Sequence, residues 1–345
     1  MKALVKYARG EGNMEVRDIP EPTPGPGQVK IAVQNAGICG SDLHIYHGDI
    51  AIPLNCPVVT GHEFCGIIAE VGEGVSNWKP GDRVTSETAF SFCGKCVYCR
   101  SGFYNLCAER KTLGYWYNGA FTAYTVVPAE RVHALPDSID FVSGAMLEPC
   151  ACVVHGVAEL THIAVGDVVL VSGPGAIGMI ASQIAKAQGA TVVLTGIDQD
   201  RERLDFAANL GVDYAVDSQR DSLGDVIDEL TGGRGADVVL ECSGVGAPVT
   251  AALDLIKKQG SFTQIGIQAK PVAIDLEKVC MKELKITGSF GSKWTSWEKA
   301  IRLVADGRIN LKDLAWKALP VTQWRDAFNE FENKEGLKLI LQPVG

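Results

Sequence analysis

The chain has 345 residues, of which 46% are hydrophobic and 21% charged, and because this length exceeds what one hydrophobic core usually supports, two domains are expected. The formal net charge of −9 argues against non-specific attraction to nucleic acid or to an anionic membrane. Residues 1–10 show no signal-peptide pattern, and no uncharged apolar run reaches the roughly 18 residues of a membrane-spanning helix, so we expect a cytoplasmic protein without a membrane partner.

The first part of the chain has the pattern of a β-domain. Pro20–Gly27 is a turn cluster rich in proline and glycine, and Val29–Val33 then alternates apolar and polar residues as a half-buried strand does. Similar short runs follow at Gly66–Val71 and Gly81–Val84. Many short strands with frequent turns predict a β-barrel-like catalytic domain, which we place at residues 1–153.

A candidate catalytic metal site is spread along this domain. Cys39, His62 and Glu63 supply the mixed sulfur, nitrogen and oxygen ligands of a catalytic zinc, which keeps one coordination position open. Glu148 is a further carboxylate that could approach the metal or its bound water. From spacing alone other interpretations stay open, because lone cysteines are often core residues and His-Glu pairs are often exposed. Glu148 could also simply begin a helix.

Four of the eleven cysteines form a compact group, at Cys93, Cys96, Cys99 and Cys107. In a reducing compartment such a cluster indicates a metal rather than disulfides, and four thiolates suit a closed, tetrahedral structural zinc site. An iron–sulfur cluster is the alternative, but no proline follows the last cysteine and no electron-transfer partner is indicated. Cysteines outside both candidate sites are expected to be small buried residues, namely Cys56, Cys65, Cys150, Cys152, Cys242 and Cys280.

Near residue 150 the pattern changes to alternating strands and helices. Asp167–Ser172 is a continuous apolar run, typical of a parallel strand covered on both faces, and a helix-length segment then extends to Gln188. Further strands and helices are expected at Thr191–Thr195, Arg201–Leu210, Ala236–Cys242 and Ser261–Ile267. This alternation predicts an α/β domain with a doubly wound parallel sheet at residues 154–292.

The last segment shows a helical pattern at Trp294–Ala305 and a strand-like pattern at Leu337–Leu341. We expect this strand to return to the first domain, so that residues 293–345 complete the catalytic domain. His155, near the predicted junction of the two domains, is expected to be a packing residue rather than a ligand.

A glycine-rich turn marks a candidate dinucleotide site. Gly173, Gly175 and Gly178 fit the G-x-G-x-x-G pattern between a predicted strand and a predicted helix. The first glycine allows the tight turn, the second lets the backbone approach a pyrophosphate, and the third permits close packing of helix and strand. The free N–H groups at the start of the helix then face the phosphates.

Asp198 lies at the distance from this turn where an acidic side chain binds the ribose hydroxyls of NAD. Its register is uncertain by a residue or two, and it could instead cap the helix that begins near Asp200. Arg201 and Arg203 could serve the 2′-phosphate of NADP. The sequence favours NAD and leaves NADP open.

In combination these segments resemble the zinc-containing medium-chain alcohol dehydrogenase family over essentially the whole chain. The resemblance rests on Gly37–Asp42, Gly61–Glu63, the four-cysteine loop, Leu147–Pro149 and the Gly173–Gly178 turn. Glutamate directly after the ligand histidine is similar to the sorbitol (polyol) and threonine dehydrogenase branch. The resemblance implies an α/β protein with a GroES-like β-barrel catalytic domain and a Rossmann domain, two zinc ions per chain, and a homotetramer, with a homodimer as the alternative.

By this resemblance, Cys39, His62 and Glu63 bind catalytic zinc, with Glu148 close to the metal, and Ser41 and His44 relay the substrate proton. Cys93, Cys96, Cys99 and Cys107 bind the structural zinc. Besides the glycine turn, the resemblance places around the cofactor Ile177, Asp198, Arg203, Ile265, Gly266, Ile267, Ser289 and Phe290.

The expected reaction is zinc-assisted hydride transfer from a secondary alcohol to NAD, giving a ketone, with a polyol such as sorbitol or iditol as the substrate. Gly291-Ser292 stands where polyol dehydrogenases usually carry Arg-Tyr, so the substrate pocket departs from that branch. Amino-alcohol oxidation of the L-threonine 3-dehydrogenase type is the alternative. A non-catalytic dinucleotide-binding protein is a remote alternative, because each expected zinc ligand is present, and the cysteine loop disfavours a zinc-free quinone reductase.

Overall fold

The computed structural model describes residues 1–268 and 270–344. The chain divides into two compact units. The first contains Met1–Pro149, Ser292–Ala305 and the segment from Leu311 onward, and the second contains Cys150–Gly291 and Asp306–Asn310. None of the helices in the described ranges combines the length and the hydropathy of a membrane span.

The first unit is built mainly from antiparallel strands. Its largest sheet has the order β10-β6-β5-β3-β18-β17, with β9 paired to β3, and smaller sheets join β2-β1-β4 and β7-β8. The strands are β1 (Lys2–Lys6), β2 (Met14–Asp18), β3 (Gln28–Gly37), β4 (Val58–Val59), β5 (Glu63–Val71), β6 (Arg83–Ser86), β7 (Ala89–Ser91), β8 (Lys111–Thr112), β9 (Tyr124–Pro128), β10 (Val132–Ala134), β17 (Ala315–Pro320) and β18 (Lys338–Gln342).

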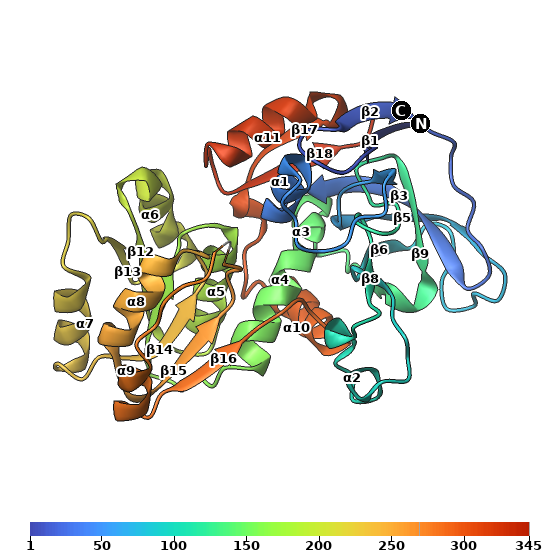
Figure 1. Ribbon diagram of the computed structural model, residues 1–345. Helices are drawn as coiled ribbons and strands as arrows, with labels where there is room; N and C mark the ends of the chain where they lie inside the picture. The colour runs from blue at the N-terminus through green and yellow to red at the C-terminus, as the bar shows by residue number, and fades with distance from the viewer. Residues whose placement is uncertain (269, 345) are drawn as a thin grey trace. The chain divides into compact units, whose positions relative to one another are not determined.

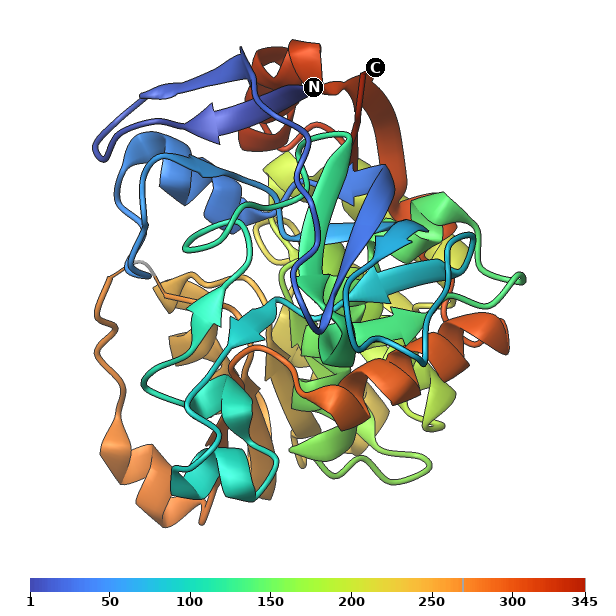
Figure 2. The same cartoon turned by 90° about the vertical axis from the view of Figure 1, so that its right-hand side faces the viewer.

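Strand β3 is the centre of this unit. Its alternating Val29, Ile31 and Val33 are buried in one apolar core, because successive side chains of a strand point to opposite faces of the sheet. The C-terminal strand β18 pairs antiparallel with the end of β3, where Ile340 lies opposite Gly37. Residues about 300 positions apart in the chain therefore lie side by side, as Figure 2 shows for the blue and red strands. The expected return of the last strand to the first domain is confirmed.

Short helices connect and cover these strands. They are α1 (Gly40–His47), α2 (Val97–Arg100), α3 (Phe141–Ala145), α10 (Trp294–Ala305) and α11 (Trp324–Glu332), while α4 (Leu147–Val154) contains the boundary between the units. Helix α11 is amphipathic, and its buried Trp324, Ala327 and Phe328 follow the i, i+3, i+4 spacing of one helix face. These residues belong to the same core as β3.

The second unit is a six-stranded parallel sheet with the order β13-β12-β11-β14-β15-β16. This order reverses between β11 and β14, and in such sheets a ligand binds at the carboxyl ends of the strands at that switch point. The elements are β11 (Val168–Ser172), α5 (Ala176–Ala187), β12 (Thr191–Gly196), α6 (Arg201–Ala207), β13 (Tyr214–Asp217), α7 (Leu223–Thr231), β14 (Ala236–Glu241), α8 (Gly246–Leu255), β15 (Ile256–Gln264), α9 (Leu276–Met281) and β16 (Lys285–Gly288).

Helices cover both faces of this sheet, so its central strand β11 is buried along its whole length (Figure 1). Val168 and Leu170 of β11 belong to one apolar cluster with Ile227 of α7 and Val249 of α8. The alternate residues Val169 and Val171 are equally buried. The predicted combination of a GroES-like β-domain and a doubly wound parallel sheet is confirmed.

Two local predictions need correction. The strand expected at Ser261–Ile267 is in fact Ile256–Gln264, because the backbone N–H groups of Ile265 and Gly266 both turn to the Glu241 carbonyl oxygen and end the pairing. The cysteines assigned to the core are also not all buried. Cys65 and Cys150 are, but Cys56, Cys152 and Cys242 are half-buried, and Cys280 is exposed on the short helix α9, which buries no side chain.

Candidate active site and metal centres

Helix α1 places Cys39 at the end of the central strand β3. Cys39 is the residue before the first turn of α1, and its backbone N–H donates to Asp42 Oδ2 at 2.9 Å. An acidic side chain in the first turn satisfies an N–H group that the helix leaves free and interacts favourably with the helix dipole. Asp42 thereby holds the backbone of Cys39 in place.

His62 and Glu63 are positioned by the start of β5. The preceding Gly61 has a φ of +88°, and a Cβ on it would overlap the Phe121 ring, so only glycine fits there. Glu63 begins β5 and pairs with Gly37 of β3. The sheet register therefore brings two distant segments together beside Cys39.

Ligand atoms of Cys39, His62 and Glu63 all lie within 4.8 Å of one another. His62 Nδ1 and Glu63 Oε1 are buried without a hydrogen-bond partner among the described residues. Burial lowers the pKa of His62, but the Cys39 side chain, Asp42 and Glu148 raise it to about 10. A buried donor set negative enough to hold a proton this firmly suits a divalent cation, which would replace that proton.

Charged groups surround this cluster. Asp42 Oδ1 lies 3.8 Å from His62 Nδ1, which matches the arrangement in which a carboxylate orients a metal-binding histidine. Lys338 Nζ, from β18, lies 2.5 Å from Glu63 Oε2 and donates to the Ile38 carbonyl oxygen at 2.6 Å. Glu148 is buried nearby and raises the pKa of Lys338 together with Glu63, against the lowering effect of burial. Glu148 does not belong to the three-residue ligand cluster.

Ser41 and His44 lie on helix α1, which begins directly after Cys39. The Ser41 hydroxyl accepts a hydrogen bond from Tyr115 Oη at 2.7 Å. His44 is 49% exposed in its side chain, and its Nδ1 lies 3.0 Å from Asp49 Oδ1. Since the two residues are three apart on a helix, they are neighbours on its surface. Ser41 is half-buried, whereas His44 is exposed to solvent.

The four remaining clustered cysteines meet in the loop that contains α2. Their sulfur atoms lie within 4.8 Å of one another, with separations of 3.8 Å for Cys93–Cys99, 3.5 Å for Cys96–Cys99 and 3.6 Å for Cys107–Cys93. Zinc–sulfur bonds of about 2.3 Å in a tetrahedron place sulfur atoms about 3.8 Å apart, whereas a disulfide needs about 2.05 Å. Backbone N–H groups of Lys95 and Cys96 also lower the pKa of Cys93 to about 6. The loop fits a tetrahedral zinc ion.

In the second unit the glycine turn joins β11 to α5 at the switch point of the sheet. Gly173 has a φ of +95°, and a Cβ on Gly178 would overlap the Gly173 carbonyl oxygen. Helix α5 begins after Gly175 with no side-chain cap, so its first N–H groups remain available to an anion. Ile177 is half-buried in the first turn.

Asp198 follows β12 but does not cap the next helix. Asp200 is the residue before α6, but its carboxylate does not cap that helix and instead accepts from the Ile197 N–H at 3.3 Å, in the turn Asp198–Asp200. Asp198 instead pairs with Arg220, which also lies 3.4 Å from Asp217 Oδ2. Arg203 is largely buried beside Asp200, and burial lowers its pKa against the raising effect of Asp200.

The carboxyl ends of β14 and β15 are joined by a buried carboxylate. Glu241 accepts from the Ser243 N–H at 2.8 Å and from Gln264 Nε2 at 2.5 Å, and its backbone oxygen accepts from Ile265 and Gly266. Ile267 and Phe290 are exposed, while a Cβ on Gly156 would contact Ile265 and Ser289. His155, by contrast, is buried and pairs with Glu159 at 2.9 Å.

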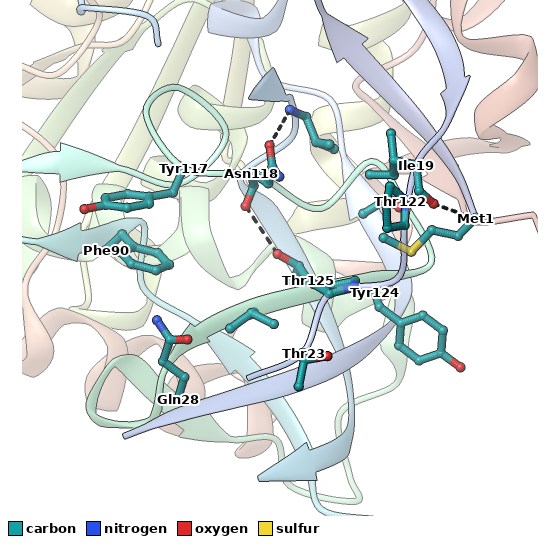
Figure 3. Close-up of a pocket in the computed structure, with 14 residues that line it drawn as sticks. Met1, Ile19, Thr23, Gln28, Phe90, Tyr117, Asn118, Thr122, Tyr124 and Thr125 are labelled. Atoms are coloured by element: carbon teal, nitrogen blue, oxygen red, sulfur yellow. Dashed lines mark hydrogen bonds between the residues drawn. The ribbon is translucent and has the colours of Figure 1, made fainter. Parts of the chain in front are cut away.

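A separate cavity of about 270 Å³ lies in the first unit (Figure 3). Its wall includes Phe90 and Tyr117, whose rings stack with centroids 3.8 Å apart, together with Asn118 and Thr125. None of the residues lining this cavity is charged at its side chain or belongs to either cysteine-containing site.

Comparison with known proteins explains this arrangement. Residues 25–137 match the alcohol dehydrogenase GroES-like domain, and residues 176–306 match the zinc-binding dehydrogenase domain. A sorbitol dehydrogenase from Halalkalibacterium halodurans is 45% identical over 345 residues, covering 100% of both chains. The chain belongs to the zinc-containing medium-chain alcohol dehydrogenase family.

Other members of the family are also similar along nearly their whole length. A D-arabitol-phosphate dehydrogenase from Enterococcus avium is 41% identical and covers 99% of this chain and 97% of its own, and an L-threonine 3-dehydrogenase from Bacillus velezensis is 36% identical with 99% of each covered. A solved zinc-binding dehydrogenase from Sinorhizobium meliloti, bound to NADP, has a TM-score of 0.92 at 31% identity, with 99% of each chain covered. This alcohol dehydrogenase is thus an oxidoreductase that depends on zinc and a nicotinamide cofactor.

Sequence reasoning did not find several side chains that organise the site. Asp42 stood in the motif used for the resemblance, but nothing local showed that it is buried against Cys39 and His62. Lys338 carried a detectable signal, because it is a lone charge in the apolar run Leu337–Leu341. Tyr115 and Arg220 carried none, since their partners lie far away in the chain.

Proposed function

We propose that this alcohol dehydrogenase oxidises a secondary hydroxyl group of a polyol to a ketone, with NAD as the hydride acceptor. The proposal is carried by the cluster of half-buried Cys39 with buried His62 and Glu63, whose mixed donors match a zinc ion with an open position. The names of two relatives above 40% identity, a sorbitol and an arabitol-phosphate dehydrogenase, support a polyol. Cys93, Cys96, Cys99 and Cys107 would hold a second, structural zinc ion.

Each residue then has a definite task. When bound, zinc supplies Lewis-acid stabilisation of the substrate oxygen and the nicotinamide accepts the hydride. Ser41 accepts the substrate proton, and His44, exposed one turn along α1, passes it to solvent. Asp42 orients His62, and Lys338 balances the charge of Glu63. Glu148 stays beside the cluster, as a ligand or as an orienting group.

The cofactor would lie along the carboxyl edge of the parallel sheet. Its pyrophosphate would face the Gly173, Gly175 and Gly178 turn with Ile177, and its ribose hydroxyls would face Asp198, which favours NAD over NADP. Arg203 would lie next to this site, and the nicotinamide half would contact Ile265, Gly266, Ile267, Ser289 and Phe290.

The same proposal includes the domain boundaries, the oligomeric state and the cellular compartment. The catalytic domain comprises residues 1–153 and 293–345, and the cofactor domain residues 154–292. The enzyme is a homotetramer, as its family resemblance implies. It works in the cytoplasm, a reducing compartment in which clustered cysteines bind metal rather than form disulfides.

NADH absorbance tests the substrate and the cofactor together. Zinc-loaded enzyme is offered NAD or NADP against polyols, inositols, L-threonine and simple secondary alcohols. Rapid reduction of NAD with polyols of one stereochemical series supports the proposal. Turnover of L-threonine alone would instead support amino-alcohol oxidation, the second candidate function. The 36% identity to an L-threonine 3-dehydrogenase is the observation that favours this candidate.

A further inference from the structure

Tyr115 brings a buried phenol to the proton-relay serine. Its Oη donates to Ser41 Oγ at 2.7 Å, although the two residues are 74 positions apart. Its ring centroid lies 5.3 Å from that of His62, tilted by 53°. Only 3% of Tyr115 is exposed, so its hydroxyl group meets the site and not the solvent.

The position of Tyr115 is held from two sides. Its ring belongs to an apolar cluster with Ile45 of α1 and Leu54, against which Ile50, Ile52 and Cys56 also pack. Its carbonyl oxygen accepts from the Asn55 N–H at 2.9 Å. Because a packed aromatic side chain has only two rotatable bonds, its hydroxyl group is fixed relative to Ser41.

We propose that Tyr115 is a positioning residue of the proton relay, which orients the Ser41 hydroxyl group and stabilises the negative charge that develops on Ser41 Oγ. This inference rests on the role of Ser41 in the proposed function. A serine hydroxyl group has one proton to donate and two lone pairs to accept with. Tyr115 occupies one lone pair, so the other is left to receive the substrate proton while the hydroxyl proton departs toward His44.

The O–H bond of Tyr115 stays intact during this transfer. The proton that Ser41 carries moves toward His44 ahead of the substrate proton, so Ser41 Oγ is transiently negative. The substrate proton then bonds to Ser41 Oγ, and no charge is left on the serine at the end of the step. A fixed donor aimed at an atom that becomes transiently negative acts as an oxyanion-hole donor does. We expect the loss of this donor to slow the proton step without loosening the apolar packing.

Tyr115→Phe removes the hydroxyl group and keeps the ring. Sorbitol oxidation with NAD is measured for the native enzyme, Tyr115→Phe, Ser41→Ala and the double variant, all loaded with zinc, and any panel polyol with faster turnover replaces sorbitol. We expect Tyr115→Phe to lower kcat on the order of tenfold in the native background and less than about twofold in the Ser41→Ala background, because the two side chains act as one unit.

A second set of measurements separates positioning from packing. Tyr115→Phe should raise the solvent deuterium isotope effect on kcat and delay proton release, followed with a pH indicator, while zinc content and Tm stay native. Tyr117→Phe is the matched control: it lies in the same loop, stacks on Phe90 in the separate cavity and should leave all four readouts unchanged. Ser41→Thr keeps a hydroxyl group, so Tyr115→Phe should again act about tenfold in that background.

Equal kcat for Tyr115→Phe and the native enzyme would overturn the inference, and so would an equal loss in the Ser41→Ala and native backgrounds. Tyr115→Phe could also lower Tm or zinc content. The inference then requires that Tyr115→Phe lower kcat more in the Ser41→Thr background than in the Ser41→Ala background. Equal falls in kcat in the two backgrounds would overturn it. Full turnover in Ser41→Ala itself would instead remove Ser41 from the proposed function.

Discussion

The Lys338–Glu63 pair allows one strong prediction, which is the effect of Lys338→Met. Both side chains are almost fully buried, and Lys338 Nζ lies 2.5 Å from Glu63 Oε2. Methionine fills a similar volume without a charge. In the metal-free protein, Glu63 would then be a buried carboxylate without the lysine that pairs with it directly.

The distance gives the size of the effect. Two unit charges 2.5 Å apart attract by about 7 kcal/mol at an effective dielectric constant of about 20. Desolvation of both groups offsets much of this, so removal of one partner of a buried pair destabilises a protein by about 3–5 kcal/mol. At about 2–4 °C of Tm per kcal/mol in a domain of this size, the metal-free protein should melt on the order of 10 °C lower.

Calorimetry of metal-free and zinc-loaded protein is the assay. Zinc places positive charge beside Glu63, so the fall in Tm should be clearly smaller in the loaded variant than in the metal-free one. Lys317→Met is the matched control, because Lys317 lies on the adjacent strand β17 and pairs with Glu330 at 2.7 Å on the surface. Its Tm should hardly change.

The reasoning about the charge balance is refuted if Lys338→Met melts at the native temperature without metal. It is equally refuted if zinc leaves the difference between variant and native protein unchanged, since the ion would then not replace the charge of Lys338. A fall of the same size in Lys317→Met would show that the effect does not come from burial.

Three further changes test the other sites. Asp198→Ala should raise the ratio of kcat/KM for NADP over NAD about tenfold or more, because it frees Arg220 for a 2′-phosphate; an unchanged ratio would contradict this. Cys99→Ser should remove about one zinc ion per chain and lower Tm, both measured after dialysis; full zinc content would exclude Cys99 as a ligand. Gly178→Ala should weaken NADH binding on the order of tenfold in a fluorescence titration, because its Cβ would overlap the Gly173 carbonyl oxygen; native affinity would show that the turn has room.

The features that sequence reasoning predicted well depend on neighbours in the chain. Helix α10 has its expected bounds, Trp294–Ala305, and the apolar run before the glycine turn is strand β11. The cysteine loop was found by spacing, because its ligands lie within one short segment and need little tertiary context to meet. Such signals are local, and the physical preferences behind them act within a few residues.

The features that sequence reasoning did not predict depend on sheet register and burial. Lys338 reaches Glu63 only because β18 pairs with β3 and β3 with β5, and no pattern in the sequence sets that alignment. Arg220 meets Asp198 for a similar reason, since β12 and β13 are neighbours in the sheet. Cys280 looked like a core residue by type, but the helix that carries it has no buried face.

The pairing of β18 with β3 also sets an order of events during protein synthesis. The cysteine loop is finished once residue 107 has left the ribosome, so it can take up its metal while most of the chain is still unmade. Glu63, in contrast, has to wait for residue 338 before its positive partner exists. A nascent chain therefore carries the Glu63 carboxylate without its lysine partner until residue 338 has been made.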